Sequence, residues 1–286
     1  MRARLPIAVV TIIMSAACGR NKPSSASKVD QGRSEPTSAS SVGDIIYRSK
    51  NGTILTRADM EKANGEVNWE IHAGPPVSAE ARDLHQQGRE AGARGDHDAA
   101  LALFERAAQL ARQWPYPAYD AAFTYLLKGD AENALRFYRR TLELAPRGFF
   151  TAITAVHYLS LESEGKLARG TYLAYVSLEW VDSQTERTRR VDAMAASVPT
   201  FAPIWKEKAT LATPPAERLA LLERGLKLDP DRETLGFLLI NKALCLRELD
   251  RKDEAVTILG ELGANESQPP DVQQIALASL ADITSK

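Results

Sequence analysis

Two stretches of this chain share one pattern, and they read GREAGARGD at residues 88–96 and AFTYLLKGD at residues 122–130. Both end in Gly-Asp, and the residues that follow them also correspond at a spacing of 34 positions. The matching pairs are Gly88 and Ala122, Ala91 and Tyr125, Ala100 and Ala134, Phe104 and Tyr138, and Ala107 and Thr141. A fixed period of this length indicates a stack of helix–turn–helix units, because one unit alone cannot bury its apolar face.

The spacing and the small residues resemble those of the tetratricopeptide repeat (TPR) family. A first repeat covers about residues 81–114, with its turn at residues 95–96. A second covers about residues 115–148, with its turn at residues 129–130. The resemblance implies paired helices that pack through small residues and present a groove to other proteins.

Further along the chain the pattern weakens and then returns. A clear repeat covers residues 236–268, and a capping helix is expected over residues 270–284. Two divergent repeats are predicted at residues 168–201 and 202–232. Three helical stretches precede Pro199, and an odd number of helices predicts an irregular superhelix there. These stretches are residues 149–164, 170–181 and 186–197.

The fold predicted for residues 78–286 is all-α, a right-handed helical-hairpin solenoid of about 12 helices. A small module over residues 43–77 precedes it. There Asn51-Gly52 lies between apolar runs and predicts a tight β-hairpin, followed by a short helix capped by Thr56 and a third strand over residues 67–71. The module is too small for a core of its own, so we expect it to cap the first helical hairpin, to dock a partner, or to lie in the groove of the repeats as a self-ligand.

Residues 1–17 have the composition of an export signal peptide. Two arginines precede an apolar stretch over residues 5–17, which is shorter than the roughly 20 residues of a membrane-spanning helix. The segment MSAAC at residues 14–18 resembles the lipobox of bacterial lipoproteins. That resemblance implies removal of the signal and acylation of Cys18. The same small residues also suit an ordinary signal peptidase that leaves no lipid, so both outcomes remain open.

Residues 18–42 are rich in Ser, Lys, Arg and Pro and are expected to be a disordered tether. A lipid on Cys18 would hold the folded part near a membrane through this tether. Gly19, in place of Asp, follows the cysteine. In lipoproteins of two-membrane bacteria this implies transport to the outer membrane. The predicted location is therefore the cell envelope, lipid-anchored at the periplasmic face of the outer membrane.

Composition and motifs argue against several classes of function. The 36 Lys and Arg residues balance 37 Asp and Glu, so no nucleic-acid partner is expected. The sequence contains no HExxH, GxSxG, CxxC or Gly-rich phosphate loop, and its four histidines are scattered. Acidic residues such as Glu162 and Asp231 are expected to be solvated charges at helix ends. We predict no catalytic residue, no metal, no cofactor and no enzymatic activity.

The first helices of such repeats normally line the concave surface, so their outward positions are the candidate binding residues. The partner-binding residues predicted in this way are Arg82, His85, Arg89, Tyr116, Tyr119 and Phe123. Together they would form a basic strip beside an aromatic one, suited to an extended segment with carboxylates and an apolar anchor. The aromatic side chains could instead pack against the next hairpin or under the predicted β-hairpin of residues 44–55.

The sequence therefore predicts a lipid-anchored envelope scaffold or adaptor that binds protein partners, either an extended peptide or another repeat protein. The alternative is an exported protein that binds a glycan or a small ligand through Trp69, Tyr116 and Tyr119.

Overall fold

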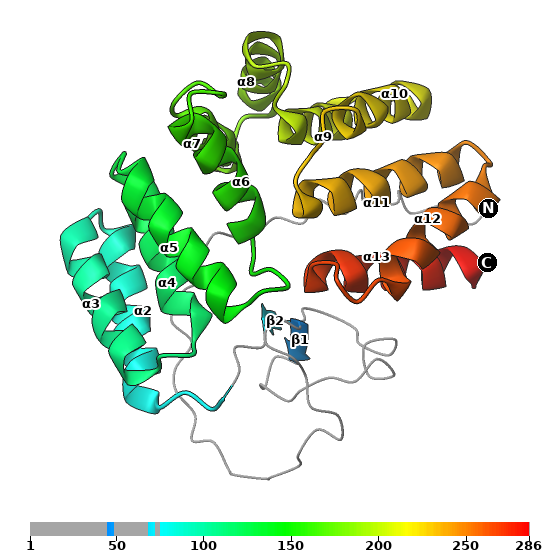
Figure 1. Ribbon diagram of the computed structural model, residues 1–286. Helices are drawn as coiled ribbons and strands as arrows, with labels where there is room; N and C mark the ends of the chain where they lie inside the picture. The colour runs from blue at the N-terminus through cyan, green and yellow to red at the C-terminus, as the bar shows by residue number, and fades with distance from the viewer. Residues whose placement is uncertain (1–44, 49–67, 72–74, 286) are drawn as a thin grey trace. The chain divides into compact units, whose positions relative to one another are not determined.

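The computed structural model describes residues 45–48, 68–71 and 75–285 of the chain (Figure 1). The predicted signal peptide, Cys18, the tether, the Asn51-Gly52 turn and the helix at Thr56 lie outside these residues. The described helices belong to two compact units, of which the first ends at Phe149 and the second begins at Phe150. Each unit is described by itself below.

The first unit contains two helical hairpins, in agreement with the first two predicted repeats. In both hairpins the second helix packs along the first, and α3 packs against α4 to join the hairpins (Figure 1). The four helices are α2 (Ala79–Ala93), α3 (His97–Leu110), α4 (Pro115–Leu127) and α5 (Ala131–Leu144).

The Gly-Asp turns explain why these hairpins form where the sequence predicts them. Gly95 and Gly129 have positive φ angles of 81° and 76°, a left-handed conformation that glycine adopts at little cost. The following aspartates, Asp96 and Asp130, each accept a hydrogen bond from the backbone N–H three residues later. These bonds cap α3 and α5, so one dipeptide ends a helix and starts the next.

Small residues allow the paired helices to approach closely, as the TPR resemblance implies. A Cβ atom added to Gly88 would lie 2.6 Å from the Phe104 ring, so only glycine fits there without displacing the ring. Ala100, Ala122 and Ala134 are fully buried. The predicted role of these positions in close helix packing is confirmed.

Two short strands precede the helices in the described part of the chain. β1 (Ile45–Arg48) and β2 (Asn68–Ile71) pair antiparallel, with Ile45 opposite Ile71 and Arg48 opposite Asn68. The strand predicted over residues 67–71 is therefore present, and its partner is the first apolar run of the module.

The second unit contains the remaining described helices, which end at Thr284. The predicted stretches 149–164, 170–181 and 186–197 are all helical, and the second of them is divided between a short α-helix and a 3₁₀ helix. The elements are α6 (Ala152–Ser163), α7 (Thr171–Val176), η1 (Ser177–Trp180), α8 (Gln184–Ser197), α9 (Ala202–Leu211), α10 (Pro215–Leu226), α11 (Arg232–Glu248), α12 (Lys252–Ala264) and α13 (Pro270–Thr284).

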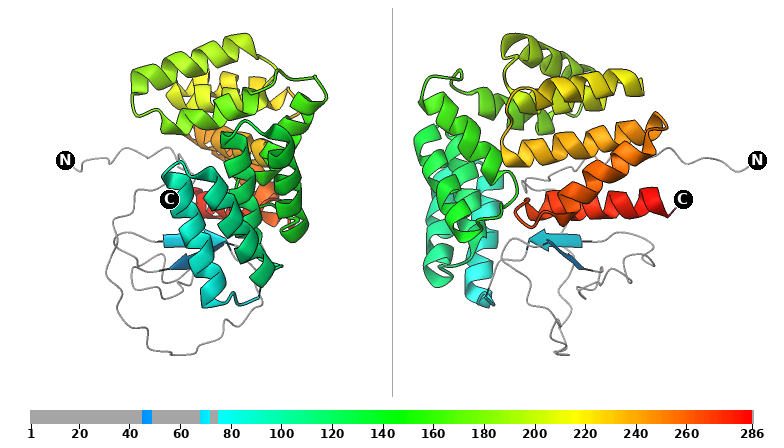
Figure 2. Two further views of the ribbon diagram at one scale, coloured as in Figure 1. Left: turned by 90° about the vertical axis from the view of Figure 1, so that its left-hand side faces the viewer. Right: turned by 45° about the vertical axis from the view of Figure 1, so that its right-hand side comes forward.

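Helices α9 to α13 pack in chain order, each against the next (Figure 2). One hydrophobic core joins α9 to α13, and its central members are Leu222, Leu238, Leu246, Leu259 and Val272, each at most 1% exposed. Cys245 is buried in this core, as predicted. The all-α helical-hairpin fold is confirmed, with twelve α-helices, α2 to α13, in the described part of the chain.

The segment around α7 departs from regular pairing. Glu162, near the end of α6, is 4% exposed, and its carboxylate accepts hydrogen bonds from the backbone N–H groups of Gly170 and Tyr172 at 2.8 and 2.7 Å. The expectation that Glu162 is a solvated charge is wrong, because its side chain caps the N-terminus of α7. Helix α8 then packs mainly on α9.

Candidate functional site

The structure buries two of the six residues predicted to face outward. His85 is 6% exposed and Tyr119 is 8% exposed. The predicted outward orientation is wrong for both. His85 is enclosed by its contacts with α4 and the segment before it, and Tyr119 by its contacts with Tyr138 and Phe149.

His85 links the two hairpins through a polar contact inside an aromatic cluster. Its Nε2 atom lies 2.7 Å from Oδ2 of Asp120 on α4. Its ring packs edge-on against Trp114 and Tyr116, with centroid distances of 4.8 and 5.8 Å. A histidine enclosed in this way holds α2 against α4 and is not presented to a partner.

Tyr119 and Tyr116 also pack against neighbouring aromatic rings. Tyr119 contacts Tyr138 and Phe149 at centroid distances of 5.7 and 5.8 Å. Tyr116 meets Phe149 edge-on at 4.8 Å. Tyr119 therefore packs inside the second hairpin and against the segment that follows it, and not against the next hairpin. Binding of a glycan stays a prediction.

The other predicted residues keep some exposure. Arg82 is exposed and donates a hydrogen bond from Nη1 to the carbonyl oxygen of Val77 at 2.7 Å. Arg89, Tyr116 and Phe123 are partly buried. A role for these four residues in partner binding stays a prediction.

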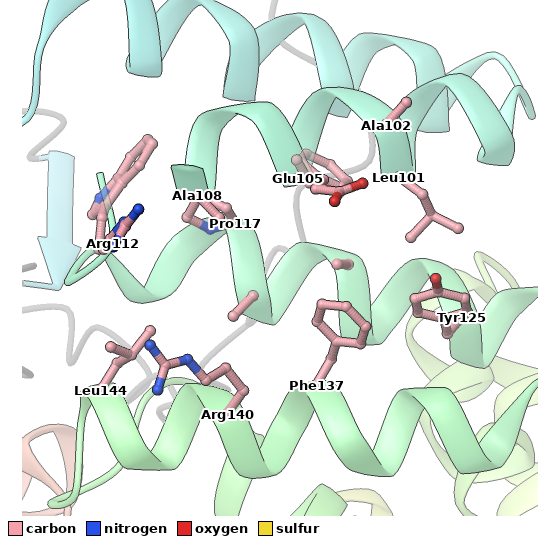
Figure 3. Close-up of a pocket in the computed structure, with 14 residues that line it drawn as sticks. Leu101, Ala102, Glu105, Ala108, Arg112, Pro117, Tyr125, Phe137, Arg140 and Leu144 are labelled. Atoms are coloured by element: carbon pink, nitrogen blue, oxygen red, sulfur yellow. The ribbon is translucent and has the colours of Figure 1, made fainter. Parts of the chain in front are cut away.

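A groove of about 480 Å³ lies elsewhere on the first unit, between α3, α4 and α5. Figure 3 shows Leu101 and Glu105 on α3 facing Phe137 and Arg140 on α5, with α4 between them. None of the six predicted residues lines this groove. It lies beside the second helices of both hairpins, whereas the prediction considered the first helices.

The groove combines an apolar floor with charged edges. Buried side chains of Phe104 and Trp114 form part of the floor, and Tyr125 and Phe137 stack with a centroid distance of 5.2 Å. The charged side chains at its edges are those of Glu105, Arg112 and Arg140. An apolar surface with a few charges is suited to an amphipathic segment of another protein.

The second unit contains a separate cavity of about 390 Å³. Its lining comes from α6, α7, η1, α8, α9 and α11. Most of its lining residues are polar or charged. This cavity could not be predicted from the sequence, because its lining residues are widely separated along the chain.

Three charged side chains form a connected group in this cavity. Glu207 accepts a hydrogen bond from Nη2 of Arg187 at 2.6 Å, and Nζ of Lys206 lies 3.2 Å from its other oxygen. The two cations lower the pKa of the Glu207 carboxyl despite its burial. Glu207 is therefore ionised at neutral pH.

A buried carboxyl group of α11 lines the same cavity. Glu233 is 3% exposed, and its Oε2 atom accepts a hydrogen bond from the backbone N–H of Thr154 at 3.3 Å. Burial and the nearby acids Asp271 and Asp231 raise its pKa well above the ordinary value. Glu233 therefore holds its proton in the folded protein under conditions in which an exposed glutamate is ionised.

Asp231 caps α11 and is not the solvated charge that the sequence suggested. It is 7% exposed, and Oδ1 accepts hydrogen bonds from the backbone N–H groups of Glu233 and Thr234 and from the Thr154 hydroxyl. These bonds tie α11 to α6 within the second unit.

Glu233→Gln should reduce the pH dependence of unfolding of the second unit. A carboxyl whose folded pKa is raised stabilises the fold below its unfolded pKa, and this stability is lost as the pH rises through the folded pKa. We expect the wild-type free energy of unfolding to fall as the pH rises above about 4.5, and that of the variant to fall less. Denaturant unfolding at a series of pH values measures both.

Glu261→Gln, at an exposed position of α12, is the matched control and should leave the wild-type profile unchanged. Some slope should remain in Glu233→Gln, because burial also raises the pKa of Asp271 to about 6. A wild-type free energy that is constant over this range would contradict the prediction.

The described residues offer neither a metal-ion site nor a membrane-spanning helix. Among them, no group of three or more His, Cys, Asp or Glu side chains is arranged to hold a metal ion. No described helix has the length and apolar character needed to cross a bilayer.

No family model and no curated protein matches this chain. Among solved structures, MamA (41-end) from Desulfovibrio magneticus RS-1 is similar, with 14% identity and a TM-score of 0.32 over 71% of this chain and 98% of that one. TTC0263, a thermophilic TPR protein of Thermus thermophilus, has 20% identity and a TM-score of 0.29 over 70% and 98%. The TPR2AB domain of yeast Sti1, in complex with pHSP90, has 13% identity and a TM-score of 0.28 over 72% and 81%. Because these sequence identities and TM-scores are low, they carry no argument for the fold. The fold assignment rests on the helical hairpins and on the repeat spacing described above.

Proposed function

We propose that this protein is a lipid-anchored scaffold or adaptor of the cell envelope that binds other proteins through its helical hairpins. The observation that carries the protein-binding part is the groove between α3, α4 and α5. It is open along three helices, and an apolar floor lies between charged edges. These are the properties of a surface that receives an amphipathic or extended segment.

The charges at the groove indicate the chemistry of the partner segment. The charged lining residues are Arg112, Arg140 and Glu105, and Arg140 also pairs with Glu143 at 2.8 Å. A segment with an apolar anchor and at least one carboxylate would complement them. The anchor would lie against Tyr125 and Phe137, whose stacked rings offer a broad surface of few rotamers.

The membrane part of the proposal is supported by the N-terminal sequence. The apolar stretch over residues 5–17 and the lipobox-like segment that ends at Cys18 are the features on which it depends. Acylation of Cys18 would anchor the chain at the periplasmic face of the outer membrane through the tether. Mass spectrometry of the mature N-terminus tests this part, and an unmodified N-terminus beyond Cys18 would contradict it.

Ala102→Arg should abolish capture of a partner by crosslinking in cells. Ala102 is exposed and lines the groove, so a long charged side chain there obstructs the groove without disturbing the core. The control is Leu110→Arg, which adds the same side chain to α3 at a position that is 50% exposed and outside the groove. Equal recovery of the wild-type partner by both folded variants would remove the groove from the proposal.

A further inference from the structure

Helices form the walls and the floor of the groove in the first unit (Figure 3). Its lining residues lie in α3, α4 and α5, except Arg112 and Trp114, which lie between α3 and α4. Helix α4 contributes the short side chains of Pro117, Ala118 and Ala121 to the floor. Longer side chains of α3 and α5 stand on either side. Two helical walls above a floor of short side chains leave a space in which a further helix can pack.

The walls offer an incoming chain few backbone partners for hydrogen bonds. Within a helix the N–H and C=O groups bond to one another. Outside the helices, the N–H of Trp114 donates to the carbonyl oxygen of Ala111 at 3.0 Å. An extended segment in the groove would therefore bury backbone polar groups without partners, whereas a helical segment satisfies its own. This difference favours a helical partner over an extended one.

The length of the groove sets the length of the helix that it can cover. The lining residues of α5 extend from Phe137 to Leu144, and those of α3 from Leu101 to Ala108. Each range corresponds to about two helical turns, or about 11 Å along the axis. Arg112 and Trp114 lengthen the groove beyond the end of α3. A partner helix would therefore be in contact over about two to three turns.

Two charged side chains at the groove have no partner in the part of the chain that the structure describes. Arg112 and Glu105 are exposed, and neither forms an ion pair or a side-chain hydrogen bond with the described residues. Arg140 differs from them, because it pairs with Glu143 on its own helix. Arg112 is therefore available to a carboxylate of a partner, and Glu105 to a cation.

The two ends of the groove differ in chemistry. Figure 3 places Arg112 near Leu144 at one end and Tyr125 near the opposite end. Tyr125 stacks on Phe137 and provides a broad aromatic surface there. A segment that fits both ends carries an acid at one end and a large apolar side chain at the other.

We propose that the groove binds an amphipathic α-helix of a partner protein, with an acidic residue and a large apolar residue about two turns apart on one face. The acid pairs with Arg112, and the apolar side chain packs on Tyr125 and Phe137. A basic residue between them, at the edge of that face, pairs with Glu105. This assignment rests on the proposed protein-binding function and specifies the chemistry of the partner.

The test is a selection from two displayed peptide libraries against the full chain. One library randomises one face of a helix held in a stable helical scaffold, and the other randomises the same number of positions in a linear peptide. We expect the binders to come from the helical library and to carry the acid and the apolar residue two turns apart. Their affinity should fall at least about tenfold with Ala102→Arg, which obstructs the groove.

Two results of this selection would overturn the proposal. One is a set of linear binders that lack a helical pattern and lose affinity with Ala102→Arg. The other is the absence of any binder that is sensitive to this substitution.

Charge reversal at the basic end tests the contact of the acid. Selection on Arg112→Glu should replace the acid of the binders by Lys or Arg at the same position, because the charge that it meets is reversed. The matched control is Arg106→Glu, at an exposed position of α3 that does not line the groove, and it should select the wild-type pattern. Selection of the same acid on Arg112→Glu would overturn the pairing.

The outcomes separate this inference from the proposed function. Helical binders that depend on the groove, without a partner captured by crosslinking in cells, would support the helix assignment and contradict the adaptor function. A partner that is captured in cells and bound through an extended segment would support the adaptor function and overturn the helix assignment.

Discussion

Glu162→Ala should destabilise the second unit by about 3 kcal/mol, the largest effect expected of any substitution of a charged residue considered for this chain. The wild-type carboxylate is buried and accepts hydrogen bonds from the backbone N–H groups of Gly170 and Tyr172. Alanine leaves both donors without this acceptor, and the bond to Tyr172 is fully buried. An unsatisfied buried donor costs about 1–3 kcal/mol.

Denaturant unfolding measures the loss, and amide hydrogen exchange locates it. Exchange should accelerate first at Gly170 and Tyr172, because these N–H groups lose their partner. Glu164→Ala is the control, since Glu164 is exposed and pairs with Lys166 at the surface, where such pairs contribute at most about 1 kcal/mol. If Glu162→Ala unfolded at the same denaturant concentration as the wild type, the Glu162 cap would contribute little to the free energy of unfolding.

The regular part of the fold could be predicted because its determinants are local. The Gly-Asp turn, with a positive φ at glycine and a side-chain cap from aspartate, involves residues that are at most three positions apart. The small residues at Gly88 and Ala100 repeat in the next hairpin at the same spacing. Such signals are present in the sequence itself, so the helices of the first two repeats appear where they were expected.

Features that depend on distant residues were not predictable in this way. His85 has the spacing of an outward position, but a contact with Asp120, 35 residues later, encloses it. Thr154 bonds to Asp231 across 77 positions, and nothing in the local pattern of either residue indicates that contact. The cavity of the second unit is built from such contacts, because α7 and η1 replace a regular helix there.

Two acidic residues near the end of α6 show the same limit of prediction from local sequence. Glu162 and Glu164 are two positions apart at the end of one helix, and sequence pattern treats both as solvated. The chain after Glu162 turns back so that Gly170 and Tyr172 present their N–H groups to it, while Glu164 stays at the surface. The direction of the backbone eight to ten residues later decides which carboxylate is buried.

Gly236→Ala should destabilise the second unit, although alanine is the better helix former. A Cβ atom at this position would lie 2.4 Å from Cγ1 and 2.7 Å from Cγ2 of Val272, which is fully buried in the core between α11 and α13. Overpacking of this kind costs about 1–3 kcal/mol, against a gain of about 1 kcal/mol from helix propensity. We expect a net loss of up to about 2 kcal/mol in denaturant unfolding.

Gly260→Ala on α12 is the matched control because no atom lies within 4 Å of the added Cβ. At Gly260 the substitution changes only the helix propensity, so we expect Gly260→Ala to stabilise the second unit by about 0.5–1 kcal/mol. Val272→Ala removes the obstructing methyl groups, so the double variant with Gly236→Ala should lose less stability than the sum of the two single losses. Opposite signs at the two glycines and this coupling would together assign the cost to the contact with Val272. Equal gains at both positions would mean that α13 moves away from α11 without cost, and the tight packing of these helices would then be refuted.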